Sequence, residues 1–214
     1  MQTFPRILIV PGWRGSGPGH WQSLWAQQLP GAERVVQDDW MLPHRDAWVQ
    51  RLEETVLARP GPVVIVAHSL GCIATTHMGA EAAARVEGAL LVAPADPERR
   101  AQFVGFAPAP CAALPYRSVL VASSNDPFCP IRLAGAYARA WGSELVRLQN
   151  AGHVNVESGH GPWPLGLALL QSLTAGLAWS SAPADTDTDT AQQVHCAHPG
   201  ALHAPDGFYM RKDD

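Results

Sequence analysis

The chain has 214 residues, of which 47% are hydrophobic and 16% charged, and its formal net charge is −4. This length and apolar fraction suit one globular domain with a sizeable core and exclude a wholly disordered chain. The excess of acidic over basic residues argues against a nucleic-acid-binding protein, which needs a basic face. No apolar run reaches the roughly 18 residues that a membrane span requires, so neither nucleic acid nor a membrane is an expected partner.

The two ends of the chain differ from its middle. The apolar run Ile7–Val10 is too short for a secretory signal and no cleavage site follows it, so we expect a mature cytoplasmic protein. Residues 174–214 hold six acidic and two basic residues and therefore carry the whole net charge. Asp alternates with Thr over 185–190, a composition that buries too little surface to fold. We predict one domain over residues 1–173 and a disordered acidic tail over residues 174–214.

Short apolar runs alternate with longer amphipathic segments along the predicted domain. The runs are continuous and rich in Val, Ile and Leu, which is typical of strands covered on both faces. We predict strands over Arg6–Val10, Arg34–Gln37, Val63–Ala67, Ala89–Val92, Ser118–Ala122 and Leu145–Leu148. We predict helices over His20–Leu29, Arg45–Ala58, Leu70–Arg85, Ile131–Trp141 and Pro164–Leu173. The alternation implies an α/β fold, with a mostly parallel sheet of about six strands and helices on both faces.

Ser69 follows one of these strands, and ligands of parallel sheets bind beyond the carboxyl ends of the strands. The sequence from Ala67 to Gly71 is Ala-His-Ser-Leu-Gly, the nucleophile-elbow pattern G-x-S-x-G with Ala in place of the first Gly. In this motif a strained turn between the strand and the next helix exposes the serine hydroxyl. The strand and the helix pass close together there, so residues 67 and 71 have to be small. The Leu70 N–H, directly after the serine, is an expected oxyanion donor. The alternative is that Ser69 only caps the helix.

A nucleophilic serine needs a base and an orienting carboxylate, which follow it in the order acid, then His, in this type of fold. Asp126 and His153 each come directly after a predicted strand. Each also has an ordinary alternative role. Asp126 could be a turn aspartate before a proline, and His153 could be a structural histidine. Three such residues at three strand ends, in the required order, predict a catalytic triad of Ser69, Asp126 and His153.

Other residues compete for these roles. Asp96 also follows a predicted strand and is the alternative acid. His160 lies in a glycine-rich loop rather than at a strand end, and His20 comes too early in the chain. His68 adjoins Ser69, so we expect its side chain to point away from the face on which the nucleophile acts.

The loop after the first strand, residues 11–19, is rich in glycine. Its spacing does not fit a dinucleotide-binding motif because a proline interrupts it. We expect the Trp13 N–H to be the second oxyanion donor, the alternative being a plain turn. We place Gly12 of this loop, His68 and Trp40 among the residues that contact the substrate.

The order of these motifs resembles a family of small serine hydrolases with the α/β-hydrolase fold, grouped around retinoblastoma-binding protein 9 and the bacterial YdeN-type proteins. The resemblance covers roughly residues 5–173. It rests on Pro11-Gly12-Trp13, Ser16-Gly17-Pro18-Gly19-His20-Trp21-Gln22, Asp39-Trp40, Ala67-His68-Ser69-Leu70-Gly71, Ser124-Asn125-Asp126-Pro127, Gly152-His153-Val154-Asn155, Ser158-Gly159 and Gly161-Pro162-Trp163-Pro164. It implies a minimal α/β-hydrolase fold without a large lid, and it supports the same triad. Ala67 and the tail after Leu173 depart from the family pattern.

From these residues we expect a carboxylesterase-like serine hydrolase that cleaves small acyl esters, or amides or thioesters, through an acyl-enzyme. No cofactor is expected, and no metal, since the four cysteines form no Cys-x-x-Cys pair. Only a short segment between Pro94 and Arg117 is available to cover the site, which suits small or aromatic acyl groups. The alternatives are a non-catalytic partner-binding module on the same scaffold and an acyltransferase with the same triad. The natural substrate and the oligomeric state remain open.

Overall fold

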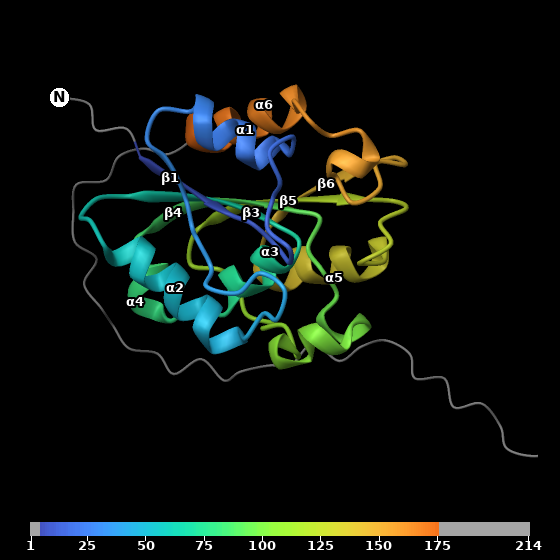
Figure 1. The fold of residues 1–214 in the computed structure, drawn as a ribbon, viewed down its shortest axis with the longest axis horizontal. Helices are drawn as coiled ribbons and strands as arrows, with labels where there is room; N and C mark the ends of the chain where they lie inside the picture. The colour runs from blue at the N-terminus through green and yellow to red at the C-terminus, as the bar shows by residue number, and fades with distance from the viewer. Residues whose placement is uncertain (1–4, 176–214) are drawn as a thin grey trace, which may run out of the picture.

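A single parallel sheet forms the centre of the protein (Figure 1). The computed structural model describes residues 5–175; residues 1–4 and 176–214 lie outside it, so the predicted acidic tail is described only at its first two residues. Within the described part, six strands pair in the order β2-β1-β3-β4-β5-β6, all parallel. They are β1 (Arg6–Val10), β2 (Ala32–Arg34), β3 (Val63–His68), β4 (Val86–Val92), β5 (Arg117–Ser123) and β6 (Glu144–Leu148). The predicted α/β fold is confirmed.

Helices cover both faces of the sheet (Figure 1). On one face lie α1 (Trp21–Gln28) and α6 (Pro164–Ala175). On the other lie α2 (Arg45–Leu57), α3 (Leu70–Thr76), α4 (Ala80–Ala83) and α5 (Ile131–Trp141). Three short 3₁₀ helices are η1 (Pro97–Arg99), η2 (Ala101–Phe106) and η3 (Val156–Ser158). No helix within residues 5–175 has both the length and the apolar character of a membrane span.

The central strand β3 shows why the apolar runs become strands buried on both sides. Alternate side chains of a strand point to opposite faces of the sheet. Val64 and Val66 accordingly pack with the helices α1 and α6, whereas Val63, Ile65 and Ala67 belong to the core beneath the other four helices. All five side chains are fully buried, so β3 is held rigidly up to the residue that precedes Ser69.

Two predicted elements differ from the observed ones. The helix predicted over Leu70–Arg85 ends at Thr76, and a separate short helix, α4, begins after Gly79. Tertiary contacts favour the break, since the Gly79 N–H donates to the Glu53 carboxylate and the His77 ring bonds a distant backbone carbonyl. The strand predicted over Arg34–Gln37 is instead β2, which ends at Arg34.

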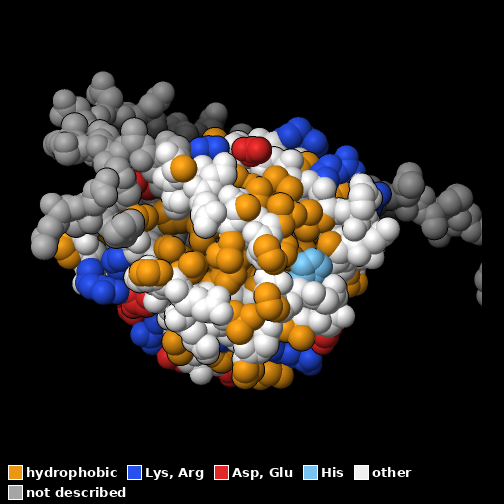
Figure 2. Space-filling view, turned by 90° about the horizontal axis from the view of Figure 1, so that it is seen from above, with side chains coloured by type: hydrophobic (Ala, Val, Ile, Leu, Met, Phe, Trp, Pro, Cys, Tyr) orange, Lys and Arg blue, Asp and Glu red, His pale blue; other side chains and the backbone are white. Residues whose placement is uncertain are grey.

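Figure 2 views the face formed by α1 and α6, where hydrophobic side chains gather at the surface. Leu165, at the start of α6, is 48% exposed, while Leu170 and Leu173 of the same helix are buried. On the other face of the sheet, α2 buries Trp48, Leu52 and Val56 and exposes Asp46 and Glu54.

Candidate active site

Ser69 lies in the tight turn between β3 and α3, and its backbone is strained. Its φ of 57° and ψ of −125° lie in a region that residues other than glycine rarely occupy. Two residues later, a Cβ on Gly71 would lie 2.4 Å from the carbonyl oxygen of Val10 in β1. Only glycine fits there, as the elbow interpretation requires. The Ser69 hydroxyl makes no helix-capping hydrogen bond, which contradicts the simple capping alternative.

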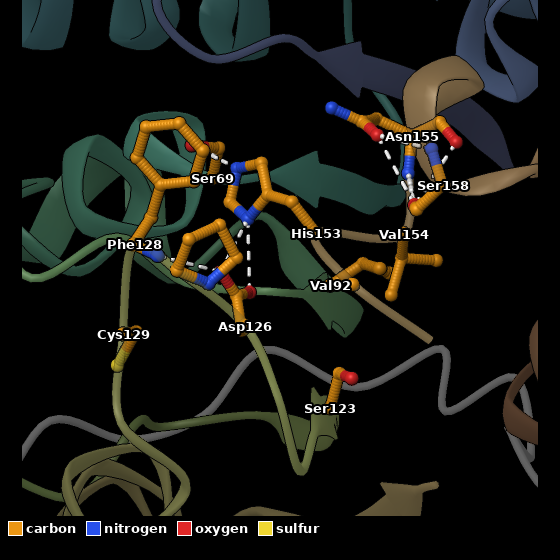
Figure 3. A network of polar contacts seen from close by, with 12 residues as sticks. Ser69, Val92, Ser123, Asp126, Phe128, Cys129, His153, Val154, Asn155 and Ser158 are labelled. Atoms are coloured by element: carbon orange, nitrogen blue, oxygen red, sulfur yellow. Dashed lines mark hydrogen bonds and ion pairs between the residues drawn. The ribbon is translucent and has the colours of Figure 1, made fainter. Parts of the chain in front are cut away.

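Ser69, His153 and Asp126 come from three different strand ends and meet in one chain of contacts (Figure 3). The Ser69 Oγ lies 2.9 Å from the Nε2 of His153. The Nδ1 of the same ring lies 2.9 Å and 3.0 Å from the two carboxylate oxygens of Asp126. Because a carboxylate only accepts hydrogen bonds, Nδ1 carries the proton and Nε2 is left to accept from the serine hydroxyl. The side chains of His153 and Asp126 are only 8% and 3% exposed, so water screens this pair weakly.

Asp126 is held by the segment that follows it. Its Oδ1 accepts the Phe128 backbone N–H at 2.8 Å, so the residue is a turn aspartate as well as the partner of His153. The Phe128 ring lies against the imidazole, with 4.3 Å between ring centroids (Figure 3). Asp96, the alternative acid, instead accepts the Glu98 backbone N–H at the start of η1.

Three polar side chains join the loop that carries Asp126 to the loop that carries His153, and one of them, Ser124, accepts the Asn150 N–H at 3.0 Å. Ser123 Oγ donates to Asn125 Oδ1 and accepts the Ala151 N–H at 3.0 Å. Asn125 Oδ1 also accepts the Gly152 N–H at 2.8 Å. Both loops are thus tied directly to the end of β5. The sequence predicted no separate role for Ser123, Ser124 or Asn125, although all three stand between the predicted strand Ser118–Ala122 and Asp126.

The backbone on both sides of His153 turns sharply. Gly152 has a φ of 57°, and a Cβ there would lie 2.5 Å from the Ser158 Cβ, so this turn requires glycine. Val154 has a φ of 48°, although it is β-branched and fully buried. Its carbonyl oxygen accepts the indole N–H of Trp21 at 2.8 Å. Helix α1 therefore helps to hold His153 in position.

A row of histidines extends behind the catalytic candidates. His68 Nε2 donates to the His153 carbonyl oxygen at 2.9 Å, and its ring lies 4.8 Å from the His153 ring and 4.9 Å from the His20 ring. Burial, together with these neighbouring imidazoles, holds the pKa of His68 well below its usual value. His20 caps α1 by accepting the Gln22 N–H, and burial is the largest of the causes that lower its pKa to about 4. Both rings are therefore neutral near pH 7.

His68 and Trp40, both expected to contact the substrate, have the following surroundings in the structure. The side chain of His68 is 5% exposed and bonds the backbone of His153, which leaves little of it for a ligand. Trp40 packs edge-on to Trp48 and lies under the Arg34 guanidinium. The Nδ1 of His160 lies 3.3 Å from the Ser158 hydroxyl, so this ring makes its polar contact with Ser158 and not with Ser69.

The loop after β1 passes close beside the nucleophile. A Cβ on Gly12 would lie 2.7 Å from the Ser69 Cβ and 3.1 Å from the Leu70 nitrogen, so only glycine leaves room there. Within residues 5–175, neither the Trp13 N–H nor the Leu70 N–H donates a hydrogen bond to the protein. Two backbone donors thus lie in the segments that flank Ser69. The Trp13 indole is fixed by its own bond to the Met41 carbonyl oxygen.

A pocket of about 330 Å³ opens next to this site. It is lined by Asp96, Arg99, Arg100, Phe103, Pro127 and Phe128. These residues come from the η1–η2 segment and from the loop after β5. No group of three or more His, Cys, Asp or Glu side chains in the described part of the chain is arranged to hold a metal ion.

A model of the serine hydrolase family matches residues 7–172. The chain belongs to this serine hydrolase family. No curated protein sequence gives a match.

Solved structures give this serine hydrolase close relatives in fold. A YdeN-like hydrolase from Pectobacterium atrosepticum is 35% identical, with a TM-score of 0.74 over 79% of this chain and 90% of that one. The ydeN gene product of Bacillus subtilis is 19% identical, with a TM-score of 0.67 over 80% of this chain and 100% of that one. Carboxylesterase CesB of B. subtilis is 14% identical, with a TM-score of 0.58 over 81% of this chain and 85% of that one, and shows the fold alone. The YdeN-type family and the α/β-hydrolase fold expected from the sequence are confirmed, and the protein is a hydrolase.

Proposed function

We propose that this serine hydrolase is an esterase that cleaves small acyl esters through an acyl-enzyme on Ser69. The observation that carries the proposal is the continuous contact chain from the Ser69 hydroxyl through His153 to the Asp126 carboxylate, with 2.9 Å from Oγ to Nε2 and 2.9 Å from Nδ1 to Oδ2. This arrangement provides a nucleophile, a general base and a group that orients the base.

In the proposed first half-reaction, Ser69 Oγ attacks the ester carbonyl carbon while His153 Nε2 takes the hydroxyl proton. Asp126 keeps the Nδ1 proton in place and stabilises the imidazolium that forms. Collapse of the tetrahedral intermediate breaks the bond to the leaving alcohol, and His153 returns the proton to that oxygen. In the second half-reaction His153 activates a water molecule, which releases the acid and restores the serine.

We assign the oxyanion hole to the backbone N–H groups of Trp13 and Leu70. Both lack an acceptor in the described structure, and the clearance at Gly12 brings the Trp13 loop against the nucleophile. Such a donor stabilises the developing negative charge by about 3 kcal/mol. His68 acts in this proposal as a positioning residue, since its neutral ring holds the backbone of His153.

The cover over the site favours small acyl or aryl groups. Only the short helices η1 and η2 and the segment up to Arg117 lie between β4 and β5 on this side, so no separate lid within residues 5–175 encloses a long chain. The adjoining pocket, at about 330 Å³, is at the small end of ligand sites and has an aromatic wall from Phe103 and Phe128.

Replacement of Ser69 by Ala tests the proposal. With 4-nitrophenyl acetate and butyrate we expect the wild type to turn over and the variant to lose at least about 10³-fold in kcat. Ser143→Ala is the matched control and should retain activity. Ser143 directly precedes β6, at the end of that strand opposite to the loop that carries His153. A fluorophosphonate probe with mass spectrometry should add one label, on Ser69.

Each alternative function gives a different result. Full hydrolysis by Ser69→Ala would refute the mechanism. A folded wild-type sample that neither labels nor hydrolyses esters would indicate the partner-binding module. Labelling followed by preferential transfer to an added alcohol or amine, rather than to water, would indicate an acyltransferase.

A further inference from the structure

Arg100 is stacked between aromatic rings from the two sides of the site. It lies between η1 and η2, and its guanidinium carbon is 4.7 Å from the centre of the Phe128 ring and 5.3 Å from the Trp13 ring. Phe128 in turn lies against His153, and Trp13 belongs to the loop beside Ser69. The Phe128 ring thus contacts both the Arg100 guanidinium and the His153 imidazole.

Within residues 5–175, the contacts of the Arg100 guanidinium are with aromatic rings and not with an acidic side chain. Among residues 5–175 its guanidinium forms no ion pair and donates no hydrogen bond; its contacts are with the two rings. The neighbouring Arg99 differs, because it lies 3.8 Å from the Asp96 carboxylate and donates to the Pro127 carbonyl oxygen at 2.9 Å. Arg99 thus offsets the one acidic side chain of the pocket, and Arg100 leaves the pocket with a net positive charge.

Stacking on aromatic rings leaves the edge of a guanidinium exposed. That planar edge presents N–H donors in a fork that matches the two oxygens of a carboxylate. The rings also restrict the side chain, so less conformational entropy is lost when a ligand binds. Arg100 is half-buried and lines the pocket, and it is therefore accessible to a bound molecule.

We propose that Arg100 binds a carboxylate on the substrate, so that the enzyme prefers esters that carry a free acid group at the end placed in this pocket. The inference rests on the proposed esterase function and specifies its substrate class. The carboxylate belongs either to the acyl part, as in a monoester of a dicarboxylic acid, or to the leaving group, as in an ester of a hydroxybenzoate. Both present the same anion to the same cation.

Two matched substrate pairs test the inference and separate these sources. The acyl pair is mono-4-nitrophenyl adipate and 4-nitrophenyl hexanoate, and the leaving-group pair is 4-acetoxybenzoate and its methyl ester. The readout is the ratio of kcat/KM for the charged to the neutral ester, corrected for spontaneous hydrolysis. We expect a ratio of about 10 to 100 in one pair, which is what charge-assisted hydrogen bonds supply, and the pair that shows it identifies the source.

Variants of the arginines decide which cation is responsible. Arg100→Met should lower the ratio about 10- to 100-fold, and Arg100→Lys should retain part of it, since the charge stays but the planar fork is lost. Arg139→Met, which is exposed in the last turn of α5 at the opposite end of that helix from Phe128, removes the same charge and should leave the ratio unchanged. Arg99→Met should lower the ratio less than Arg100→Met.

The possible failures are distinguishable. A wild-type ratio near or below one in both pairs, or an unchanged ratio in Arg100→Met, overturns the carboxylate inference and leaves the esterase proposal standing. Equal losses in Arg99→Met and Arg100→Met also overturn it, since they indicate a diffuse field rather than a contact. An enzyme that hydrolyses none of the four esters overturns both proposals.

Discussion

Replacing Gly71 by Ala tests the steric basis of the nucleophile elbow. The added Cβ would lie 2.4 Å from the Val10 carbonyl oxygen and 2.7 Å from that of Pro11. Ordinary contact begins near 3.4 Å, so α3 or β1 has to move by about 1 Å. Both neighbours are backbone atoms of buried elements, which cannot rotate away as a side chain can.

The cost follows from this geometry. Overpacking a dense core with one additional group typically costs 1–3 kcal/mol, and a clash with backbone on both sides belongs at the upper end. Part of the cost is regained because alanine favours the helix over glycine by about 1 kcal/mol. We therefore expect Gly71→Ala to lower the free energy of unfolding by about 2 kcal/mol. A shift of α3 by this distance also moves the Leu70 N–H away from the substrate carbonyl.

Urea unfolding and esterase assays on the folded fraction measure both effects. Gly105→Ala is the matched control, because a Cβ there meets no atom within 4 Å and its φ is not positive. We expect the control to unfold within about 0.5 kcal/mol of the wild type, while kcat of Gly71→Ala falls at least about tenfold. Equal stability and activity in the two variants would refute the idea that close passage of helix and strand fixes the elbow.

Two further predictions concern the acid and the histidines. Asp126→Asn should keep the fold but lower kcat about 10³- to 10⁴-fold, because an amide can stabilise the wrong imidazole tautomer. Asp96→Asn is its control. A larger loss of kcat in Asp96→Asn than in Asp126→Asn would assign the acid to Asp96. Since the pKa of His20 is lowered from 6.5 to about 4, the unfolded state binds a proton first as pH falls, and stability is lost between pH 6.5 and 4. From pH 7 to 5 this contributes about 2 kcal/mol, measured by urea unfolding. His20→Asn retains a cap for Gln22 and should lose acid sensitivity by that amount, whereas an unchanged pH slope would contradict the assignment.

Much of the fold follows from local patterns in the sequence. Strands β1, β3 and β5 lie in continuous apolar runs because both of their faces are covered, and α2 shows its buried face at helical spacing. The chain order of Ser69, Asp126 and His153 at strand ends was enough to predict that the three residues meet. In an all-parallel sheet the carboxyl ends of the strands share one edge, so residues that directly follow different strands lie close together.

The remaining features depend on contacts that are distant in sequence. The helix after Ser69 ends early because Gly79 and His77 bind groups more than 20 residues away, and no local pattern contains that information. The side chain of His68 is oriented by the carbonyl oxygen of His153, 85 residues along the chain. Arg100 is one arginine among many in the sequence, and only folding brings it between two aromatic rings.

The link between the loops after β5 and β6 tolerates amino-acid substitutions unequally on its two sides. On one side it depends on three specific side chains, Ser123, Ser124 and Asn125, but on the other it uses main-chain N–H groups of residues 150, 151 and 152. Every amino acid except proline supplies such a donor. Variation at Ala151 is therefore compatible with an undisturbed base, whereas an exchange at Asn125 removes the acceptor of the Gly152 N–H beside His153.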